Sequence, residues 1–167
     1  MDATIAGERA ALDAATRQDW VNRCETAYTT VYRGLIAMGY PTHDAADAVQ
    51  DAFEDALRQR TPVDRAEGWL FVVAHRRLRR SRWRQRKFHP LELVRGSIRS
   101  DRDEEIDLLT ELRRLTERQR TVVVARYVLG LSQAEIAEVL GITPGTVAAT
   151  AHQATALLRE RLLGGKS

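Results

Sequence analysis

The densest group of chemically active side chains in this sequence is a run of cations between positions 76 and 87. Eight of these twelve residues are arginine or lysine, and none is acidic. The whole chain carries a formal net charge of only +3, so the remainder is net acidic. A dense local patch of this kind displaces counterions from phosphates, and without such a partner its charges repel one another. The run therefore predicts contact with nucleic acid, with the solvated end of a helix as the alternative interpretation.

Residue types that serve catalysis are sparse and scattered. The four histidines (His43, His75, His89, His152) lack metal-ligand spacing, and none of them stands beside the single cysteine, Cys24. One cysteine cannot form an internal disulfide, and on an apolar helix face it is usually part of the core. The sequence predicts no enzymatic activity, no metal and no cofactor.

Length and composition favour a folded protein that is not inserted in a membrane. The chain has 167 residues, 44% of them hydrophobic, which suits one medium domain or two small helical ones. The first residues lack the basic start and apolar run of a signal peptide, and no apolar stretch reaches the ~18 residues that span a bilayer. We expect a cytoplasmic location.

Apolar residues recur at helical spacing through the first half. A first helix is expected from about Arg17 to Met38, with a buried stripe. A second should follow a cap at Asp44, and a third should begin near Arg65. The apolar stripe of the third helix ends at Leu78, so its cationic end is expected to project from the core as a bare basic rod.

A stretch that holds Pro90, Gly96 and Ser97 then separates two regions of regular pattern. We predict an all-α protein of two small helical domains joined by a flexible linker. The predicted domains cover residues 1–88 and 104–167, and the linker covers residues 89–103.

The second domain contains two strong helix-start patterns. Ser132 and Glu135 have the spacing of a capping box, in which each side chain bonds the other residue's backbone amide. Thr143 can cap a following helix, and Pro144 suits its first position because the missing amide hydrogen is not needed there.

Three further positions between and within these two helices match a helix-turn-helix. A small residue, Ala137, stands where the helices would cross, and Gly141 stands at the turn. Val147 is the aliphatic residue that would lock the second helix against the first. An ordinary helical hairpin is the alternative, but it does not require these coincident positions.

The order of these motifs resembles bacterial sigma factors of the extracytoplasmic-function type, within the sigma-70 family. Residues 44–53 resemble the family's polymerase-binding helix, and residues 66–74 resemble the start of its promoter-melting helix. Residues 115–120 and 130–147 resemble its promoter-binding helix-turn-helix. The resemblance covers residues 17–163 in the expected order and spacing.

The resemblance implies three interfaces and no chemistry beyond binding. Core RNA polymerase would contact the acidic face of the second helix: Asp47, Gln50, Asp51 and Glu54. The promoter −10 element would contact the third helix and the loop before it: Arg60, Asp64, Arg76, Arg79, Arg80, Trp83 and Arg84. The −35 element would contact Ser132, Thr143, Thr146, Thr150 and Gln153. An anti-sigma factor or another regulatory protein is a further expected partner.

Two positions depart from the family pattern. Arg76 stands where an asparagine is common in the family, so we expect base reading at the −10 element to be altered or lost. The second departure is larger, because the family's recognition helix usually continues with lysine and arginine, whereas no permanent cation occurs here between Arg126 and Arg159. Since phosphate contacts supply much of DNA affinity, we expect weak −35 binding.

Three functions are therefore compared. A sigma factor accounts for both halves of the chain. A simple helix-turn-helix activator leaves the first half unused. A sigma-like interaction protein, which binds polymerase or a regulator without reading the −35 element, accounts best for the alanine-rich recognition helix.

Overall fold

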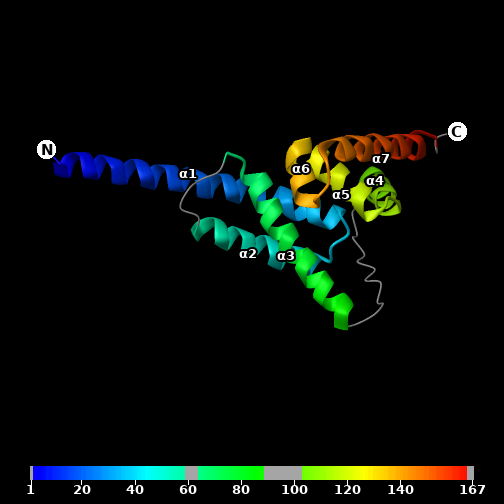
Figure 1. The fold of residues 1–167 in the computed structure, drawn as a ribbon, viewed down its shortest axis with the longest axis horizontal. Helices are drawn as coiled ribbons and strands as arrows, with labels where there is room; N and C mark the ends of the chain where they lie inside the picture. Colours follow the sequence, from blue (N-terminus) through cyan, green and yellow to red (C-terminus); the bar gives the residue numbers. More distant parts are fainter. Residues whose placement is uncertain (1, 59–63, 89–102, 165–167) are drawn as a thin grey trace.

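The structure, a computed structural model, describes residues 2–58, 64–88 and 103–164, and every regular element within these ranges is helical (Figure 1). The first half consists of α1 (Asp2–Ala37), α2 (Thr42–Arg58) and α3 (Ala66–Phe88). The second half consists of α4 (Asp103–Arg114), α5 (Glu117–Val123), the π-helical turn η1 (Val124–Val128), α6 (Gln133–Leu140) and α7 (Pro144–Gly164). The all-α prediction is confirmed.

The three helices of the first half pack around the apolar stripe of α1. All six predicted members of that stripe are buried: Trp20, Cys24, Ala27, Val31, Leu35 and Met38. The indole of Trp20 donates a hydrogen bond to the Ala56 carbonyl of α2 at 3.0 Å. Its ring also meets Trp69 of α3 edge to face, with centroids 5.8 Å apart. One aromatic side chain thus joins all three helices.

The first helix begins fifteen residues earlier than the sequence indicated, at Asp2 instead of about Arg17. Side chains from Ala10 to Asp19 are exposed, so burial does not explain this extension. The added segment is rich in alanine, which has the highest intrinsic helix propensity. A search for an apolar stripe could not detect a helix that forms by propensity without packing.

The predicted helix-turn-helix is confirmed in detail. Ser132 caps α6: its hydroxyl accepts from the Glu135 amide at 3.2 Å, and the Glu135 carboxylate accepts from the Ser132 amide at 2.6 Å. Gly141 ends the helix in the left-handed conformation, with φ of +65°. Ala137 and Val147 are both buried where α6 and α7 meet.

The two halves share one hydrophobic core. Val122, Val124, Leu129, Ile136 and Val147 of the second half belong to the same buried cluster as Trp20 and Leu70 of the first. A smaller cluster has all its buried members in the second half: Leu112, Leu115, Val123, Ala154 and Leu158. Ala37 of α1 packs against it. Leu129 lies so close to α1 that a Cβ added at Gly34 would stand 3.2 Å from its Cδ2 atom.

Two arginines extend this contact with hydrogen bonds between the halves. Arg65, just before α3, donates to the Glu135 carboxylate and to the Leu129 carbonyl, both at 3.2 Å. Arg120 of α5 donates to the Met38 carbonyl at 3.1 Å. Residues 89–102 of the predicted linker lie outside the described residues, and Asp103 is the first residue of α4. The division into domains stays a prediction, while the contact between the halves is a property of this structure.

Candidate nucleic-acid interface

The cationic run lies on α3, and its arginines point in different directions. Arg76, Arg79 and Arg80 are exposed, and none of them forms an ion pair within residues 2–58, 64–88 and 103–164. The last buried residue of the helix is Leu78, as the apolar pattern predicted. The side chains of Trp83 and Arg84, and the whole of Arg60, lie outside the described residues. Asp64 is exposed, and its backbone carbonyl accepts from Arg23 at 3.0 Å.

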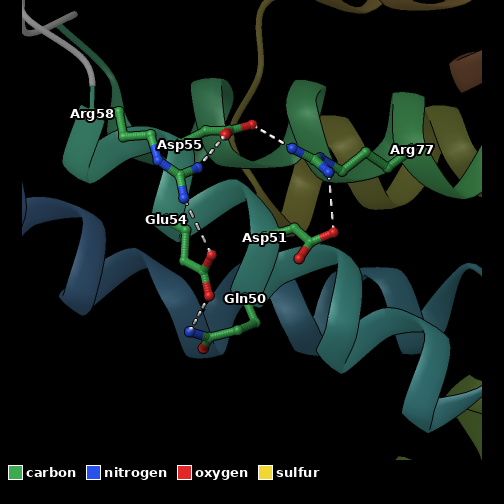
Figure 2. Close-up of polar contacts among 6 residues, drawn as sticks. All are labelled: Gln50, Asp51, Glu54, Asp55, Arg58 and Arg77. Atoms are coloured by element: carbon green, nitrogen blue, oxygen red, sulfur yellow. Dashed lines mark hydrogen bonds and ion pairs between the residues drawn. The ribbon is translucent and has the colours of Figure 1, made fainter.

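Arg77 is not a free surface cation, because its side chain joins α3 to the acidic face of α2. Its guanidinium contacts the Asp51 carboxylate at 3.0 Å and also donates a short hydrogen bond to Asp55 (Figure 2). The hydrogen bond to Asp55 is the main reason why the pKa of Arg77 is raised. The sequence analysis did not predict the contacts of Arg77 with Asp51 and Asp55. The available signal is that Arg77 stands one helical turn after Val73, and both residues line the groove toward α2.

The remaining residues of the predicted polymerase-binding face differ in the side-chain contacts that they make. Glu54 lies 3.6 Å from Arg58 and accepts from Gln50 at 3.4 Å (Figure 2). Asp47 is exposed and has no ion pair in the described part of the chain. Of the four predicted residues, Asp47 therefore presents the most available charge.

A groove of about 650 Å³ is lined by both sets of charges, which Arg77 joins through Asp51 and Asp55. Its acidic wall on α2 comprises Asp44, Asp47, Asp51 and Asp55, and its basic wall on α3 comprises Arg76, Arg77, Arg80 and Arg82. The predicted protein-binding and DNA-binding faces are therefore adjacent surfaces of the same helix pair. Such a charge division suits two different partners, one cationic and one anionic.

The expectation of a bare basic rod beyond Leu78 is wrong for Arg82. Its guanidinium stacks over the Tyr40 ring at 4.1 Å from the centroid and donates to the Gly39 carbonyl at 3.1 Å. It also lies 3.8 Å from the Glu117 carboxylate of α5. The second half of the protein packs beside this part of α3, which the linear pattern of the helix could not indicate.

The recognition helix α7 presents small and polar residues to solvent. Thr143, Thr146 and Gln153 are exposed, whereas Thr150 is partly buried. The Thr143 hydroxyl accepts from the Thr146 amide at 3.1 Å and lies 2.9 Å from the Thr146 hydroxyl. Ser132 is exposed as well, but its hydroxyl is occupied as the cap of α6. The exposed face of α7 thus offers hydrogen bonds and alanine methyl groups but no permanent charge between Val147 and Leu158.

Adding cations to that face is expected to strengthen DNA binding. Ala149 and Gln153 are exposed one turn apart on α7, so Ala149→Lys with Gln153→Lys should gain two phosphate contacts. Each contact steepens the dependence of log affinity on log salt by about 0.9. Fluorescence anisotropy with labelled duplex DNA at several salt concentrations measures this slope. The matched control places the same charges on exposed positions of α1, as Ala11→Lys with Ala14→Lys, and an equal change there would refute the assignment to α7.

Metal binding and thiol reactivity depend on the acidic, histidine and cysteine side chains of the described residues. In the ranges that the structure describes, no cluster of three or more histidine, cysteine, aspartate or glutamate residues could hold a metal ion. Burial raises the pKa of the Cys24 thiol to about 11, which keeps it protonated and unreactive.

Among the described helices, none is both long and apolar enough to cross a bilayer.

Comparison with known proteins agrees with this arrangement. The family described as Sigma-70, region 4 matches residues 105–158. The RNA polymerase sigma-E factor of Streptomyces coelicolor (strain ATCC BAA-471 / A3(2) / M145) is 39% identical over 87 residues, which cover 48% of this chain and 49% of that protein. The sigma-E factor of Streptomyces antibioticus is 35% identical over 86 residues, 48% of each. The chain thus spans about half the length of the curated relatives that it matches.

Two solved structures share the architecture over nearly the whole chain. CnrH, solved in complex with the cytosolic domain of CnrY, is 26% identical with a TM-score of 0.61, covering 98% of this chain and 97% of that one. The sigma factor RpoE of Bartonella quintana, solved with the anti-sigma factor NepR, is 20% identical with a TM-score of 0.67, covering 87% and 97%. Residues 105–158 thus match the sigma-70 region 4 family, and the chain as a whole is similar in fold to the solved structures of CnrH and RpoE.

Proposed function

We propose that this protein binds core RNA polymerase and directs it to promoters, where it promotes DNA melting and transcription initiation. One observation carries the proposal: a region 4 helix-turn-helix follows a three-helix bundle whose third helix exposes Arg76, Arg79 and Arg80. A sigma factor needs both parts, because it must hold polymerase and read DNA at the same time. Opening DNA requires only a binder that prefers unstacked bases, so cations and aromatic groups suffice.

Each surface has a role in this proposal. The acidic face of α2 binds core polymerase through Asp47, Gln50, Asp51 and Glu54. The basic face of α3 and the preceding loop bind the −10 element, with Arg60, Asp64, Arg76, Arg79, Arg80, Trp83 and Arg84. The helix-turn-helix meets the −35 element through Ser132, Thr143, Thr146, Thr150 and Gln153. Residues 1–88 and 104–167 are the two functional domains, and residues 89–103 connect them.

A regulatory protein and a cytoplasmic location complete the proposal. Both solved relatives were captured with a second protein, in one case an anti-sigma factor and in the other the cytosolic domain of CnrY. A partner that holds the two halves together would keep polymerase from separating them. Core polymerase is a cytoplasmic enzyme in bacteria, so its partner must reach it there.

A second candidate function rests on the recognition helix. Its exposed face lacks permanent charge from Val147 to Leu158, which favours a protein that binds polymerase or a regulator without reading −35 DNA. Comparison of the native chain's affinity for promoter DNA and for random DNA separates the two candidates, because only a −35 reader should distinguish the two.

Reversing the charge of Asp47 is expected to weaken polymerase binding. Asp47→Lys puts a cation into a face meant for a basic partner and breaks no ion pair of the described residues. We expect at least about a tenfold loss of affinity for purified core polymerase, since like charges at an interface cost more than 1.4 kcal/mol. Asp13→Lys, the same change on the exposed part of α1, is the control. Equal retention of both variants on immobilised polymerase would contradict the role of α2.

A further inference from the structure

A second cavity lies between the two halves of the protein. Its volume is about 350 Å³, and its lining comes from α3, α5 and α6: His75, Arg79, Arg82, Glu117, Arg118, Thr121 and Leu140. Pockets that hold small molecules begin at about this size. A DNA duplex or a protein helix, at least about 10 Å across, is too large for it. The occupant that fits is a small ligand.

The lining of this cavity carries an excess of positive charge. Three guanidinium groups, those of Arg79, Arg82 and Arg118, face one carboxylate, that of Glu117. Glu117 is 3.8 Å from Arg82, a long contact, and its side chain is 60% exposed. It therefore compensates the cations only in part. Exposed guanidinium groups such as those of Arg79 and Arg118 bind phosphate oxygens in a bidentate manner. The guanidinium of Arg82 is partly buried and already donates to the Gly39 carbonyl, so it contributes its charge to the cavity.

His75 adds an unsatisfied polar group to the same wall. Its side chain is only 3% exposed, and its Nδ1 atom has no hydrogen-bond partner among the described residues. The ring is fixed between Phe71, at 5.2 Å, and Tyr40, at 6.0 Å between centroids. Burial is the main reason why the pKa of His75 is lowered to about 4, and the charges of Arg79 and Arg82 lower it further. Buried polar atoms without partners are rare, and a bound ligand is one explanation for them.

We propose that this cavity binds a diphosphate group, as free pyrophosphate or as the diphosphate end of a nucleotide. The three arginines match the charge of a diphosphate better than that of a single phosphate. Arg79 and Arg82 come from the first half and Arg118 comes from the second, so the bound anion bridges the halves. This site goes beyond the proposed promoter and polymerase contacts, and it shares Arg79 with the proposed −10 contacts.

Isothermal titration of the full chain with inorganic pyrophosphate tests the site. We expect binding to the native chain that weakens about tenfold or more in Arg118→Ala, because a charge-assisted hydrogen bond is lost. The control is Arg159→Ala, which removes another exposed arginine, from α7 outside the cavity, and should bind as the native chain does. His75→Phe, which keeps an aromatic ring between Phe71 and Tyr40, should also weaken binding while circular dichroism reports an intact fold.

A second titration with ADP identifies the source of the diphosphate. Tighter binding of ADP than of pyrophosphate assigns the site to a nucleotide, and the reverse order assigns it to the free anion. No detectable binding of either would overturn the proposal. Equal weakening in Arg118→Ala and Arg159→Ala would overturn it too, because the interaction would then reflect overall charge. Binding that an acidic peptide matches at equal concentration would instead assign the cavity to a protein segment.

Discussion

Simultaneous replacement of Arg76, Arg79 and Arg80 by alanine is expected to abolish promoter opening while binding of core polymerase is retained. All three side chains are exposed on α3 next to or beyond its last buried residue, so the fold should survive. Each lost phosphate contact lowers the salt slope by about 0.9, and three together should reduce DNA affinity on the order of 100-fold. Permanganate footprinting of the polymerase complex measures opening, and co-purification measures polymerase binding.

The matched control removes exposed arginines elsewhere, as Arg33→Ala with Arg159→Ala. Promoter opening should persist in this variant. If the folded triple variant instead failed to bind polymerase, the basic face of α3 would serve a protein and not DNA.

Acid is expected to destabilise the protein through His75. The folded-state pKa is about 4, against 6.5 for an ordinary histidine, because burial and two nearby arginines disfavour the imidazolium. Below pH 6.5 the His75 imidazole binds a proton in the unfolded chain but not in the folded chain. The free energy of unfolding therefore falls as the pH falls toward 4. Above pH 6.5 both states are neutral and this contribution vanishes. The loss attributable to His75 should reach about 2 kcal/mol at pH 5.

Urea unfolding at pH 7 and pH 5 measures this effect, and comparison of variants separates it from the titration of carboxylates. His75→Gln should reduce the loss of unfolding free energy between the two pH values. His152→Gln, which changes an exposed histidine on α7, should leave it as in the native chain. An unchanged pH dependence in His75→Gln would contradict a buried neutral imidazole.

The parts of the fold that short-range patterns determine could be predicted from the sequence. The capping box of Ser132 and Glu135, the left-handed turn at Gly141 and the buried Val147 depend on residues within about four turns of one another. The buried stripe from Trp20 to Met38 follows from helical spacing alone. Such features need no knowledge of how distant segments meet.

The contact between the halves could not be predicted, because it depends on segments far apart in the chain. Arg65 bonds Glu135 and Arg120 bonds Met38 across 70 and 82 positions of sequence. The contact between the halves also explains why Arg82 lies near Glu117 and why a cavity forms beside His75. The sequence places Arg77 in the cationic run, yet the register of α2 against α3 turns it toward Asp51 and Asp55.

Closure of the two halves on each other bears directly on the proposed function. In this arrangement Arg79 and Arg82 face α5 across the cavity, while Arg76 and Arg80 line the groove on the side of α2. Promoter DNA would gain access to the whole basic face only when the second half moves away from α3. In the proposed function polymerase would bind the opposite, acidic wall of the groove, where Asp47 lies.

Transcription by purified core RNA polymerase tests the central claim most directly. The template is fragmented genomic DNA of the source organism, and sequencing of RNA 5′ ends maps the start sites with and without the protein. We expect a defined set of start sites that appears only when the protein is present and is lost in the Arg76, Arg79 and Arg80 triple variant. A protein that binds core polymerase but produces no start site of its own would contradict a sigma factor and would favour the sigma-like interaction protein.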